Sequence, residues 1–476
     1  MINLFETRAK IICTIGPSSS DYETLVRMID AGMDIARLNF SHGSHDAHRQ
    51  VMDNIRKAAA QVGKQVALLQ DLQGPKIRVG IFKNGPIELH IGEKFTITSR
   101  DVDGDQHIVS TTYKELPGDV KVGDDLLLDD GLLRLRVVSK TGTDVVCEVI
   151  IGGVLKNNKG INLPGVHVSA PSLTEKDAED LLFGLANDVD YVALSFVRKP
   201  EDILHVKEVI RAHGKNTPVV AKIEKPEAID CIERIIAITD GLMVARGDLG
   251  VEMKTEEVPP IQKRLIHLCN RAGVPVITAT QMLDSMVNNP RPTRAEASDV
   301  ANAILDGSDA VMLSAETASG KYPVETIATM KQIIKLIEKE IPHDQSKRRK
   351  TGVELQMMQE GIAIAACGLA DMLEADAIVN ITMTGAMSKL VAKHRPGTPI
   401  IAITHSEQVC RQLNLVWGVR GINVADLKED IDESIEKVKK DLVKRKILTV
   451  GQRILITAGL PFGGRGATNT VRVETV

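Results

Sequence analysis

Aromatic residues are scarce in this chain of 476 residues, where Phe, Tyr and Trp together make up 3% and tryptophan occurs once. Proteins that stack unpaired bases rely on aromatic side chains. The formal net charge of −4 also provides no basic excess with which to hold a phosphate backbone. Composition therefore argues against nucleic acid as a partner.

Long apolar runs are lacking as well, since none approaches the roughly 18 residues that a membrane-spanning helix requires. The sequence opens without a charged-then-apolar leader. Its six cysteines are scattered, with no Cys-x-x-Cys pair. We therefore expect a cytoplasmic protein without membrane contact, whose cysteines are reduced and mostly buried as small apolar side chains.

What the chain does contain is an alternation of short apolar runs and helix-like segments, over a length that predicts two to four domains. The runs that read as strands cover residues 10–16, 34–40, 65–72, 190–197, 218–224, 241–248, 275–281 and 310–316. Eight such units are the number that closes a (β/α)8 TIM barrel. Polar residues gather at the carboxyl ends of these runs, which is the face where barrel enzymes place their chemistry.

One connection is far too long for a barrel loop, which usually has about 2–6 residues. Residues 73–169 separate the third and fourth runs and show strand-like patterns at 87–92, 126–131 and 134–138. We expect a small all-β domain inserted here, serving as a lid over the barrel mouth. The barrel domain then comprises residues 1–72 and 170–342.

Residues 352–476 return to the alternating pattern and predict an open-sheet α/β domain. Expected strands cover 377–382, 399–404, 453–458 and 470–474, and expected helices cover 353–374, 389–394 and 430–444. The polar, basic stretch 345–351 is interpreted as the linker between this domain and the barrel.

Two of the predicted barrel strands end in charged residues that an apolar core would exclude. Lys222 and Glu224 close the run 218–224, on the same side of the strand and about 7 Å apart. The next run along the chain ends at Asp248. Two carboxylates and one ammonium on neighbouring strand ends suit a hard divalent cation and a phosphate group.

Seven short motifs occur in order along nearly the whole chain: RLNFSHG at 37–43, GPKIR at 74–78, NKGINLPG at 158–165, KIE at 222–224, MVARGDLG at 243–250, TATQML at 278–283 and NPRPTRAE at 289–296. Together they resemble the pyruvate kinase family. The resemblance implies Mg²⁺-dependent phosphoryl transfer from phosphoenolpyruvate to ADP, giving pyruvate and ATP in glycolysis. It also implies a barrel, a lid and a C-terminal regulatory domain, assembled as a homotetramer.

The resemblance assigns roles to residues at the barrel mouth. Glu224 and Asp248 match ligands of Mg²⁺ or Mn²⁺, and Lys222 matches the lysine that stabilises the migrating phosphoryl group and the enolate. Thr280 matches a threonine near the methyl carbon of pyruvate, where a water relay is the better acid because a hydroxyl is too weak. Gly247 would let the backbone approach the substrate closely.

Phosphate and nucleotide contacts are implied in the same way. Arg37 matches a catalytic, phosphate-binding arginine, whose planar fork fits phosphate oxygens in pairs. Arg78 and Lys159 match residues that meet the nucleotide phosphates when the lid closes, and Asn39 and His42 lie on the same nucleotide-binding side. For Arg78 and Lys159, an ordinary surface salt bridge is the alternative interpretation.

The monovalent-cation site departs from the family pattern. Asn39, Ser41 and Asp71 retain three of the K⁺ ligands, but Leu72 replaces the threonine whose carbonyl is the fourth. Potassium-dependent members have DTKGPE where this chain has DLQGPK at 71–76. Lys76 therefore places an ammonium where an acid stood, and a fixed cation would repel an added one. We expect that K⁺ is not required and that Lys76 serves as an internal cation.

Two other features, a histidine triplet and a turn in the C-terminal domain, have structural alternatives to a binding role. His42, His45 and His48 are spaced by three but are interpreted as one turn residue and two solvent-facing helix residues rather than as metal ligands. The turn at 382–388 and the glycine-rich loop at 463–468 match the place where family members bind sugar phosphates. The usual basic residue is missing there, so AMP or a sugar monophosphate is a better expectation than fructose 1,6-bisphosphate. An ordinary strand-to-helix turn stays open as an alternative.

Two other functions remain open at this point. A Mg²⁺-dependent aldolase or lyase could use the same barrel and a pyruvate enolate, although it would not need a lid that carries Arg78. A catalytically silent regulatory homologue is the second alternative, although such a protein would be free to lose Lys222, Glu224 and Thr280. The extra carboxyl-terminal domain of some bacterial members is not expected in this chain.

Overall fold

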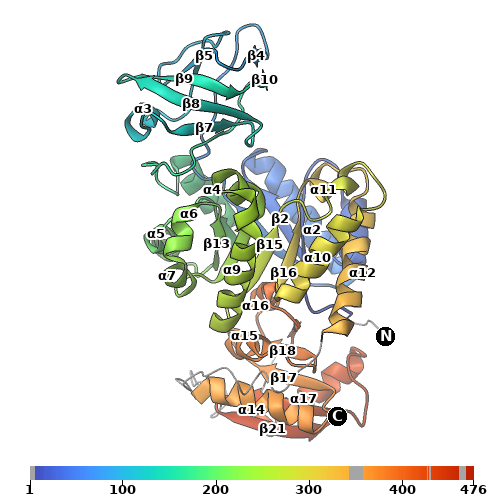
Figure 1. Ribbon diagram of the computed structural model, residues 1–476. Helices are drawn as coiled ribbons and strands as arrows, with labels where there is room; N and C mark the ends of the chain where they lie inside the picture. The colour runs from blue at the N-terminus through green and yellow to red at the C-terminus, as the bar shows by residue number, and fades with distance from the viewer. Residues whose placement is uncertain (1–5, 342–357, 426, 428–429, 460–467) are drawn as a thin grey trace.

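The computed structural model describes residues 6–341, 358–425, 427, 430–459 and 468–476. Figure 1 shows three units along one long axis: an all-β unit at one end, a barrel in the middle and an α/β sheet at the other end. The barrel separates the two smaller units, so each of them contacts a different end of its strands.

The central barrel is closed by eight parallel strands. They are β1 (Lys10–Thr14), β2 (Ile35–Asn39), β3 (Ala67–Asp71), β12 (Tyr191–Leu194), β13 (Val219–Ile223), β14 (Gly241–Ala245), β15 (Val276–Ala279) and β16 (Ala310–Leu313). Nearly all their residues are buried, as expected for parallel strands covered on both faces. All eight sequence-predicted runs are confirmed as barrel strands. Each strand ends before its predicted run does, because the last residues of each run leave the ladder and lie in the loop, turn or helix that follows.

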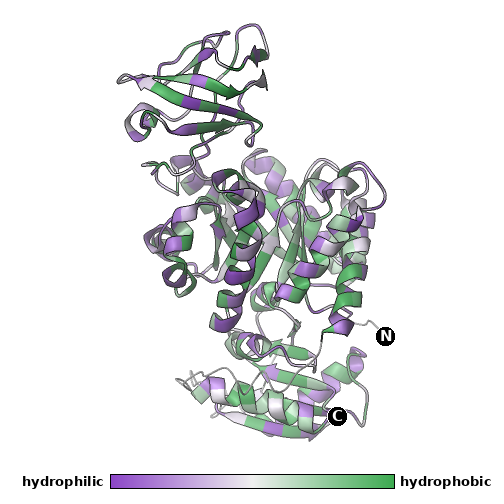
Figure 2. Cartoon of the chain, in the orientation of Figure 1, coloured by the Kyte–Doolittle hydropathy of each residue, from purple (hydrophilic) through white to green (hydrophobic). Residues whose placement is uncertain are grey.

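Helices surround this barrel, and Figure 2 shows hydrophilic and hydrophobic residues alternating along them. They are α1 (Tyr22–Ala31), α2 (His45–Val62), α4 (Glu175–Ala186), α5 (Pro200–Ala212), α6 (Pro226–Asp230), α7 (Ile232–Ile236), α8 (Arg246–Glu252), η1 (Thr255–Glu257), α9 (Val258–Ala272), η2 (Asp284–Val287), α10 (Arg294–Asp306), α11 (Ala315–Ala318) and α12 (Pro323–Glu340). Side chains fix where several of them begin. Thr174 and Asp177 form a capping box at α4, and Thr293 and Glu296 form one at α10.

The all-β unit lies between β3 and α4 in the sequence, and we call it the insert. It contains β4 (Ile87–Leu89), β5 (Lys94–Thr98), β6 (Ile108–Ser110), α3 (Leu116–Asp119), β7 (Asp125–Leu128), β8 (Leu133–Lys140), β9 (Asp144–Ile151), β10 (Gly153–Leu155) and β11 (Ile161–Asn162). Six strands form a curled sheet in the order β11-β7-β8-β9-β5-β6, and β10 pairs with β4. The residues of β8 alternate between buried and partly exposed, so the sheet has one apolar face around a core of its own. The sequence prediction of an all-β insertion is confirmed.

The C-terminal unit is a five-stranded sheet in the order β19-β18-β17-β20-β21, parallel except for β21. Its elements are α14 (Met358–Met372), β17 (Ala377–Ile381), α15 (Ala386–Lys393), β18 (Ile400–Thr404), α16 (Glu407–Gln412), η3 (Leu413–Leu415), β19 (Val419–Asn423), α17 (Ile431–Lys444), β20 (Arg453–Ala458) and β21 (Thr470–Thr475). The sequence prediction missed α16 and the edge strand β19. The predicted linker 345–351 lies outside the described residues.

Four aspartates mark the amino-terminal floor of the barrel. Each one directly precedes β2, β12, β14 or β16, and its Oδ2 accepts the backbone N–H of a residue in the neighbouring strand at 2.8–3.0 Å. Three of them also bind an arginine of the C-terminal unit: Asp34 binds Arg420 at 2.6 Å, Asp190 binds Arg411 at 2.9 Å and Asp309 binds Arg395 at 3.1 Å. The C-terminal unit is therefore attached to the end of the barrel opposite the candidate site.

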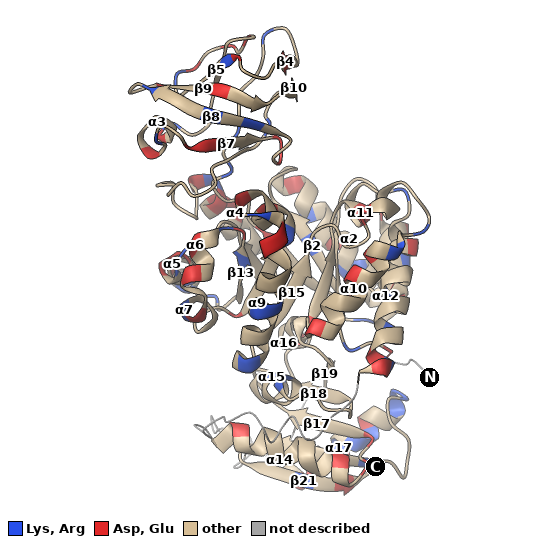
Figure 3. Cartoon of the chain, in the orientation of Figure 1, with Lys and Arg blue, Asp and Glu red and all other residues tan. Residues whose placement is uncertain are grey.

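The sign of the surface charge is mixed over the three units, and Figure 3 shows Lys and Arg interspersed with Asp and Glu on the outer helices. Within the described part of the chain, no helix is both long and apolar enough to cross a membrane.

Candidate active site

Lys222 lies at the centre of the candidate site, near the carboxyl end of β13. Its Nζ is 2.9 Å from Glu224 Oε1 and 3.1 Å from Asp71 Oδ1, and it donates a hydrogen bond to Ser195 Oγ at 2.6 Å. Burial alone would lower the pKa of Lys222, but Asp71 and Glu224 outweigh it and raise that pKa above its ordinary value. The side chain is therefore a buried ammonium that keeps its charge.

Glu224 and Asp248 come from neighbouring strand ends. Glu224 follows β13 directly, and its Oε2 accepts the backbone N–H of Phe196 at 2.7 Å. Asp248 lies in the first turn of α8, just after β14, rather than in the strand where the sequence pattern placed it. Burial raises the pKa of Glu224, and the charge of Asp248 raises it further, so Lys222 only partly offsets the negative charge. This arrangement would favour an added cation.

The donor set fits a divalent ion that completes its shell elsewhere. Hard carboxylate oxygens are the ligands that Mg²⁺ and Mn²⁺ prefer. In the part of the chain that the structure describes, no three His, Cys, Asp or Glu side chains are grouped to hold a metal by themselves. A metal bound by Glu224 and Asp248 would therefore take its other ligands from substrate and water, as Mg²⁺ commonly does.

Thr280 follows β15 in a left-handed conformation with φ of 70°, which is strained for a β-branched residue. Its Oγ1 accepts the N–H of Gly247 at 2.8 Å and donates to Ala279 O at 2.6 Å. Arg246 holds the same loop, because it donates to Thr280 O at 2.7 Å while pairing with Asp299 at 2.7 Å. Sequence reasoning quoted Arg246 in a motif but gave it no role, and only the fold shows that it positions Thr280.

The nearest neighbour of Gly247 on its side-chain side is Thr280. A Cβ added at Gly247 would lie 3.4 Å from Thr280 Oγ1, which is ordinary van der Waals contact. Local packing therefore does not by itself require glycine, and the close approach of a substrate to this backbone stays a prediction.

Arg37 and Lys222 are joined through Asp71. Arg37 Nε donates to Asp71 Oδ2 at 2.6 Å, and its Nη1 donates to Thr14 Oγ1 at 2.8 Å. Burial would raise the pKa of Asp71, but Lys222 and Arg37 outweigh it and lower that pKa. A buried carboxylate thus fixes two cations side by side at the barrel mouth, where both could face a phosphoryl group.

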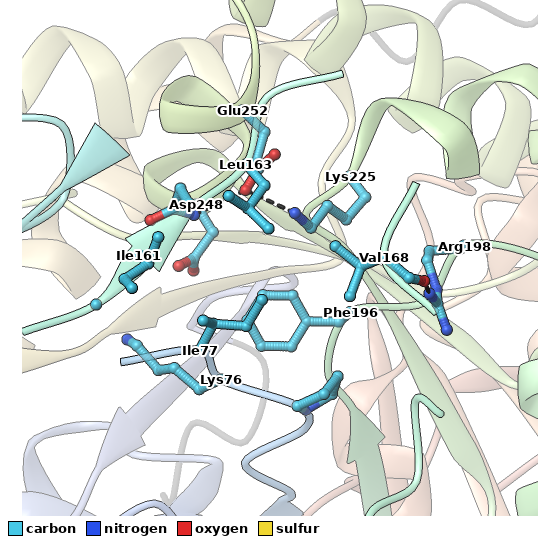
Figure 4. Close-up of a pocket in the computed structure, with 13 residues that line it drawn as sticks. Lys76, Ile77, Ile161, Leu163, Val168, Phe196, Arg198, Lys225, Asp248 and Glu252 are labelled. Carbon is cyan, nitrogen blue, oxygen red and sulfur yellow. Dashed lines mark hydrogen bonds and ion pairs between the residues drawn. The ribbon is translucent and has the colours of Figure 1, made fainter. Parts of the chain in front are cut away.

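Of the predicted monovalent-cation ligands, Asn39, Asp71 and Leu72 already accept protein donors. Asn39 Oδ1 accepts the N–H of Ser41 at 3.1 Å, and the Leu72 carbonyl accepts Ser195 Oγ at 2.7 Å. Asp71 is paired with two cations as described. Lys76 lines the same pocket as Asp248 (Figure 4).

The four predicted nucleotide-binding residues are spread over two units. Arg78 and Lys159 belong to the insert, where Arg78 donates to Asn158 O at 3.0 Å and Lys159 pairs with Asp129 at 2.7 Å. Lys159 is thus in the kind of surface salt bridge that the sequence left open. His42 and Asn39 belong to the barrel. His42 is exposed in the turn between β2 and α2, three residues after Asn39.

His45 and His48 are not on the solvent side of α2, which corrects the sequence interpretation. Both are half-buried. His48 stacks on Phe40 with ring centroids 4.0 Å apart, and His45 stacks on Phe183 at 4.2 Å. These ring contacts account for both side chains as parts of the packing between α2 and its neighbours.

A pocket lies between the insert and the barrel, beside Asp248 (Figure 4). Glu252, the last residue of α8, forms an ion pair with Lys225 at 2.7 Å and accepts a hydrogen bond from Asn162 of the insert at 2.8 Å. Sequence reasoning missed this trio. The available signal was its proximity to known motifs, because Asn162 lies in NKGINLPG and Glu252 follows MVARGDLG by two residues.

Comparisons with known proteins match the whole chain to one family. The family model for the pyruvate kinase barrel domain matches residues 6–327, and the model for the pyruvate kinase alpha/beta domain matches residues 360–474. The chain is 47% identical over 475 residues to a pyruvate kinase of Sporosarcina psychrophila and 48% identical over 472 residues to one of Geobacillus stearothermophilus. Each alignment covers 98% of this chain and 80% of the relative. A crystal structure of a pyruvate kinase from Cryptosporidium parvum superposes with a TM-score of 0.93 at 35% identity, covering 99% of this chain and 96% of that one.

Proposed function

The chain belongs to the pyruvate kinase family, and from that premise we propose which of its residues carry the reaction. Its activity is that of a pyruvate kinase (EC 2.7.1.40), a glycolytic transferase that moves a phosphoryl group from phosphoenolpyruvate to ADP. This activity replaces the lyase and the silent homologue considered above. The observation that carries the residue assignment is the buried Lys222 ammonium, held between Asp71 and Glu224 beside Asp248.

The division of labour in the chain follows its three units. We propose a catalytic barrel domain of residues 1–72 and 170–342, a lid domain of residues 73–169 and a regulatory domain of residues 352–476. The separate cores of the insert and of the C-terminal sheet support this division. The lid role is supported by the pocket between the insert and the barrel mouth.

Pyruvate kinases use a divalent metal ion. We propose that Glu224 and Asp248 hold Mg²⁺ or Mn²⁺ here. A divalent ion held by these two carboxylates would supply positive charge that offsets the charge building up during transfer. The raised pKa of Glu224 supports this proposal, because Glu224 is buried and lies close enough to Asp248 for the two negative charges to oppose each other.

Lys222 and Arg37 would bind the migrating phosphoryl group between them. Both are already oriented by Asp71, so little reorganisation is needed when charge develops. Thr280 would stand near the methyl carbon of pyruvate and direct a water that protonates the enolate. The strained positive φ of Thr280, held by hydrogen bonds from Gly247 and Arg246, supports a functional role for this residue.

The nucleotide would bind where the lid meets the barrel. In this proposal Arg78 and Lys159 of the lid bind the ADP phosphates, and Asn39 and His42 contact the nucleotide from the barrel. Lys159 would then exchange its partner Asp129 for a phosphate, which costs little because exposed salt bridges contribute only about 0–1 kcal/mol.

Potassium independence is the finer proposal at this site. The oxygens of Asn39, Asp71 and Leu72 already accept protein donors, and Lys222 and Arg37 supply fixed positive charge around Asp71. Lys76 adds an ammonium in the neighbouring pocket. A further monovalent cation would have to displace these donors and would be repelled by these charges.

Salt substitution tests this proposal. Activity in tetramethylammonium chloride should stay within a few fold of activity in potassium chloride at equal ionic strength. The Lys76→Glu variant should instead be strongly activated by K⁺, because it restores the acid of potassium-dependent members. Strict K⁺ dependence of the unaltered enzyme would contradict the proposal.

Assembly, effector and location are proposed from family membership. We propose a homotetramer in the cytoplasm, where six free thiols would persist. A phosphorylated effector would bind at the turn before α15. Ser388 is fully buried in the first turn of α15, and residues 382–388 include no basic residue, which supports AMP or a sugar monophosphate over fructose 1,6-bisphosphate. Of the glycine-rich loop, residues 463–467 lie outside the described residues.

The direct test of the catalytic assignment replaces Lys222. We expect Lys222→Met to lower kcat by about 10²–10³, because a charge aimed at the transition state is lost. A lactate-dehydrogenase-coupled assay with and without ADP measures this. Lys57→Met, an exposed change on α2, is the control and should retain full activity. Undiminished turnover by Lys222→Met would overturn the assignment.

A further inference from the structure

Glu252 connects three parts of the molecule through one carboxylate oxygen. Its Oε1 accepts the side-chain amide of Asn162, from β11 of the insert, at 2.8 Å. The same oxygen lies 2.7 Å from the Nζ of Lys225, which follows β13 (Figure 4). Glu252 is itself the last residue of α8. One atom therefore links the insert to two barrel elements.

Those two elements carry the candidate metal ligands. Asp248 lies four residues before Glu252, so the two side chains lie on the same face of α8. Lys225 is the residue next to Glu224 in the chain. The β7–β8 turn of the insert also lies near α8, since a Cβ added at Gly131 would lie 3.7 Å from Val251 Cγ1. A displacement of the insert would thus act directly on the helix that bears Asp248.

Burial makes a purely structural role for Glu252 expensive. The residue is 4% exposed, and its second oxygen, Oε2, has no hydrogen-bond partner among the described residues. A buried acceptor without a donor costs about 1–3 kcal/mol. Packing alone would be served by an apolar residue of similar volume, so the carboxylate at this position calls for an explanation in terms of charge.

We propose that Glu252 is a positioning residue that couples closure of the lid to the placement of Asp248 on α8. Lys225 holds the Glu252 carboxylate in place, and the hydrogen bond from Asn162 connects that carboxylate to the insert. When the insert lies on the barrel, the Asn162–Glu252 bond holds α8 with its first turn facing the substrate. The proposal rests on the proposed role of Asp248 as a metal ligand.

Coupling of this kind is reciprocal, so a metal at Asp248 must also favour the closed insert. Hydrogen exchange measured by mass spectrometry can follow both α8 and the insert without enzymatic turnover. In the unaltered enzyme, Mg²⁺ should slow amide exchange around residues 246–250 and, by about fivefold or more, around residues 158–165 of the insert.

Variants of Asn162 and Glu252 test whether the hydrogen bond between them transmits the Mg²⁺ effect. Asn162→Asp sets two carboxylates against each other, and Glu252→Gln removes the charge that holds Lys225. Each change should abolish the Mg²⁺ effect at 158–165 while leaving protection at 246–250 detectable. The double variant Asn162→Asp with Glu252→Gln exchanges amide and carboxylate, and it should recover most of the effect. Asn84→Asp and Glu256→Gln, both exposed, are the matched controls.

The outcomes separate the two proposals. If Mg²⁺ protects neither region of the unaltered enzyme, the metal assignment fails, and this inference fails with it. If Mg²⁺ protects 246–250 but not 158–165, or if both single variants keep full protection at 158–165, the coupling fails while the metal site stands. Rescue by the double variant would exclude simple loss of folding as the cause.

Discussion

At the scale of single residues, the site is built from charges that hold one another in place. Asp71 fixes Arg37 and Lys222, and Lys222 in turn contacts Glu224. Burial alone would lower the pKa of Lys222, but Asp71 and Glu224 outweigh it and keep the ammonium charged. Burial alone would likewise raise the pKa of Asp71, but Lys222 and Arg37 outweigh it and keep the carboxylate charged. A phosphoryl group would therefore meet cations that are already charged and oriented, which is the condition for electrostatic stabilisation of its transfer.

Glu224 offers a residue-scale prediction about metal affinity. Glu224→Gln keeps the size of the side chain and the acceptor for Phe196 N–H but removes one of two candidate ligand charges. We expect Mn²⁺ affinity to fall at least tenfold, because hard cations prefer carboxylate oxygens. Electron paramagnetic resonance of free Mn²⁺ measures this directly. Glu233→Gln, exposed on α7, should bind Mn²⁺ as the unaltered protein does. If both variants bound Mn²⁺ equally well, Glu224 would not be a ligand and the metal site would lie elsewhere.

At the scale of helices and strands, the sequence predicted most of what short-range patterns determine. All eight barrel strands were located, because strands buried on both faces read as continuous apolar runs. The strand β19 was missed because its residues include Arg420 and Gly421, which break such a run. Asp248 was placed in a strand because its run has no breaker before the helix begins at Arg246.

Contacts between distant segments could not be predicted in this way. Lys222, Glu224 and Asp248 could be grouped because parallel barrel strands end at one face. The Asn162–Glu252 bond joins residues 90 positions apart in different units. The stacking of His45 on Phe183 likewise depends on how α2 packs against α4. Local sequence holds no record of such pairings, so the half-buried histidines and the Glu252 trio required the fold.

Gly184 gives an element-scale prediction about helix packing. It is buried in α4, where an added Cβ would lie 2.0 Å from Gln70 Oε1. Gln70 is fully buried and donates to Asp180 O at 2.6 Å, so it has little room to move. Gly184→Ala should therefore lower the free energy of unfolding by about 1–3 kcal/mol through overpacking.

Gly368 is the matched control for this change. It lies within α14, and an added Cβ would meet nothing within 4 Å. Gly368→Ala should raise the free energy of unfolding by about 0.5–1 kcal/mol, because alanine favours the helix. Urea unfolding followed by circular dichroism compares the two variants. Effects of the same sign would show that packing against Gln70 is not what requires glycine at 184.

At the scale of the whole molecule, ion pairs lie at the amino-terminal floor of the barrel as well as at its mouth. The C-terminal unit binds there through Arg420, Arg411 and Arg395, each on an aspartate that also accepts a barrel-strand N–H. Burial would raise the pKa of Asp34, but Arg420 and Lys10 outweigh it and lower that pKa. The C-terminal unit is thus attached to the end of the barrel opposite the candidate site.

Lys10 makes this interface sensitive to pH. It is fully buried, and its Nζ donates to Val419 O of the C-terminal unit at 2.7 Å. Burial, with a smaller effect of Arg420, lowers the pKa of Lys10 from 10.5 to about 7. Between these two values the unfolded chain binds a proton that the native state does not, so the free energy of unfolding rises with pH across the window. Below pH 7 both states are protonated and this pH dependence disappears.

Lys10→Met removes that dependence and provides the measurement. From pH 7 to pH 9, the stability of the unaltered protein should rise by about 2 kcal/mol relative to the variant, since each pKa unit corresponds to about 1.4 kcal/mol. Between pH 5.5 and 6.5 the difference should stay nearly constant. Urea unfolding can be followed by the fluorescence of Trp417, the single tryptophan, which lies at this interface with the Arg395 guanidinium 4.7 Å from its ring centroid. Lys57→Met is the exposed control. A difference that does not change between pH 7 and pH 9 would mean that Lys10 stays charged in the native interface, held by Asp34, Asp309 and Glu338.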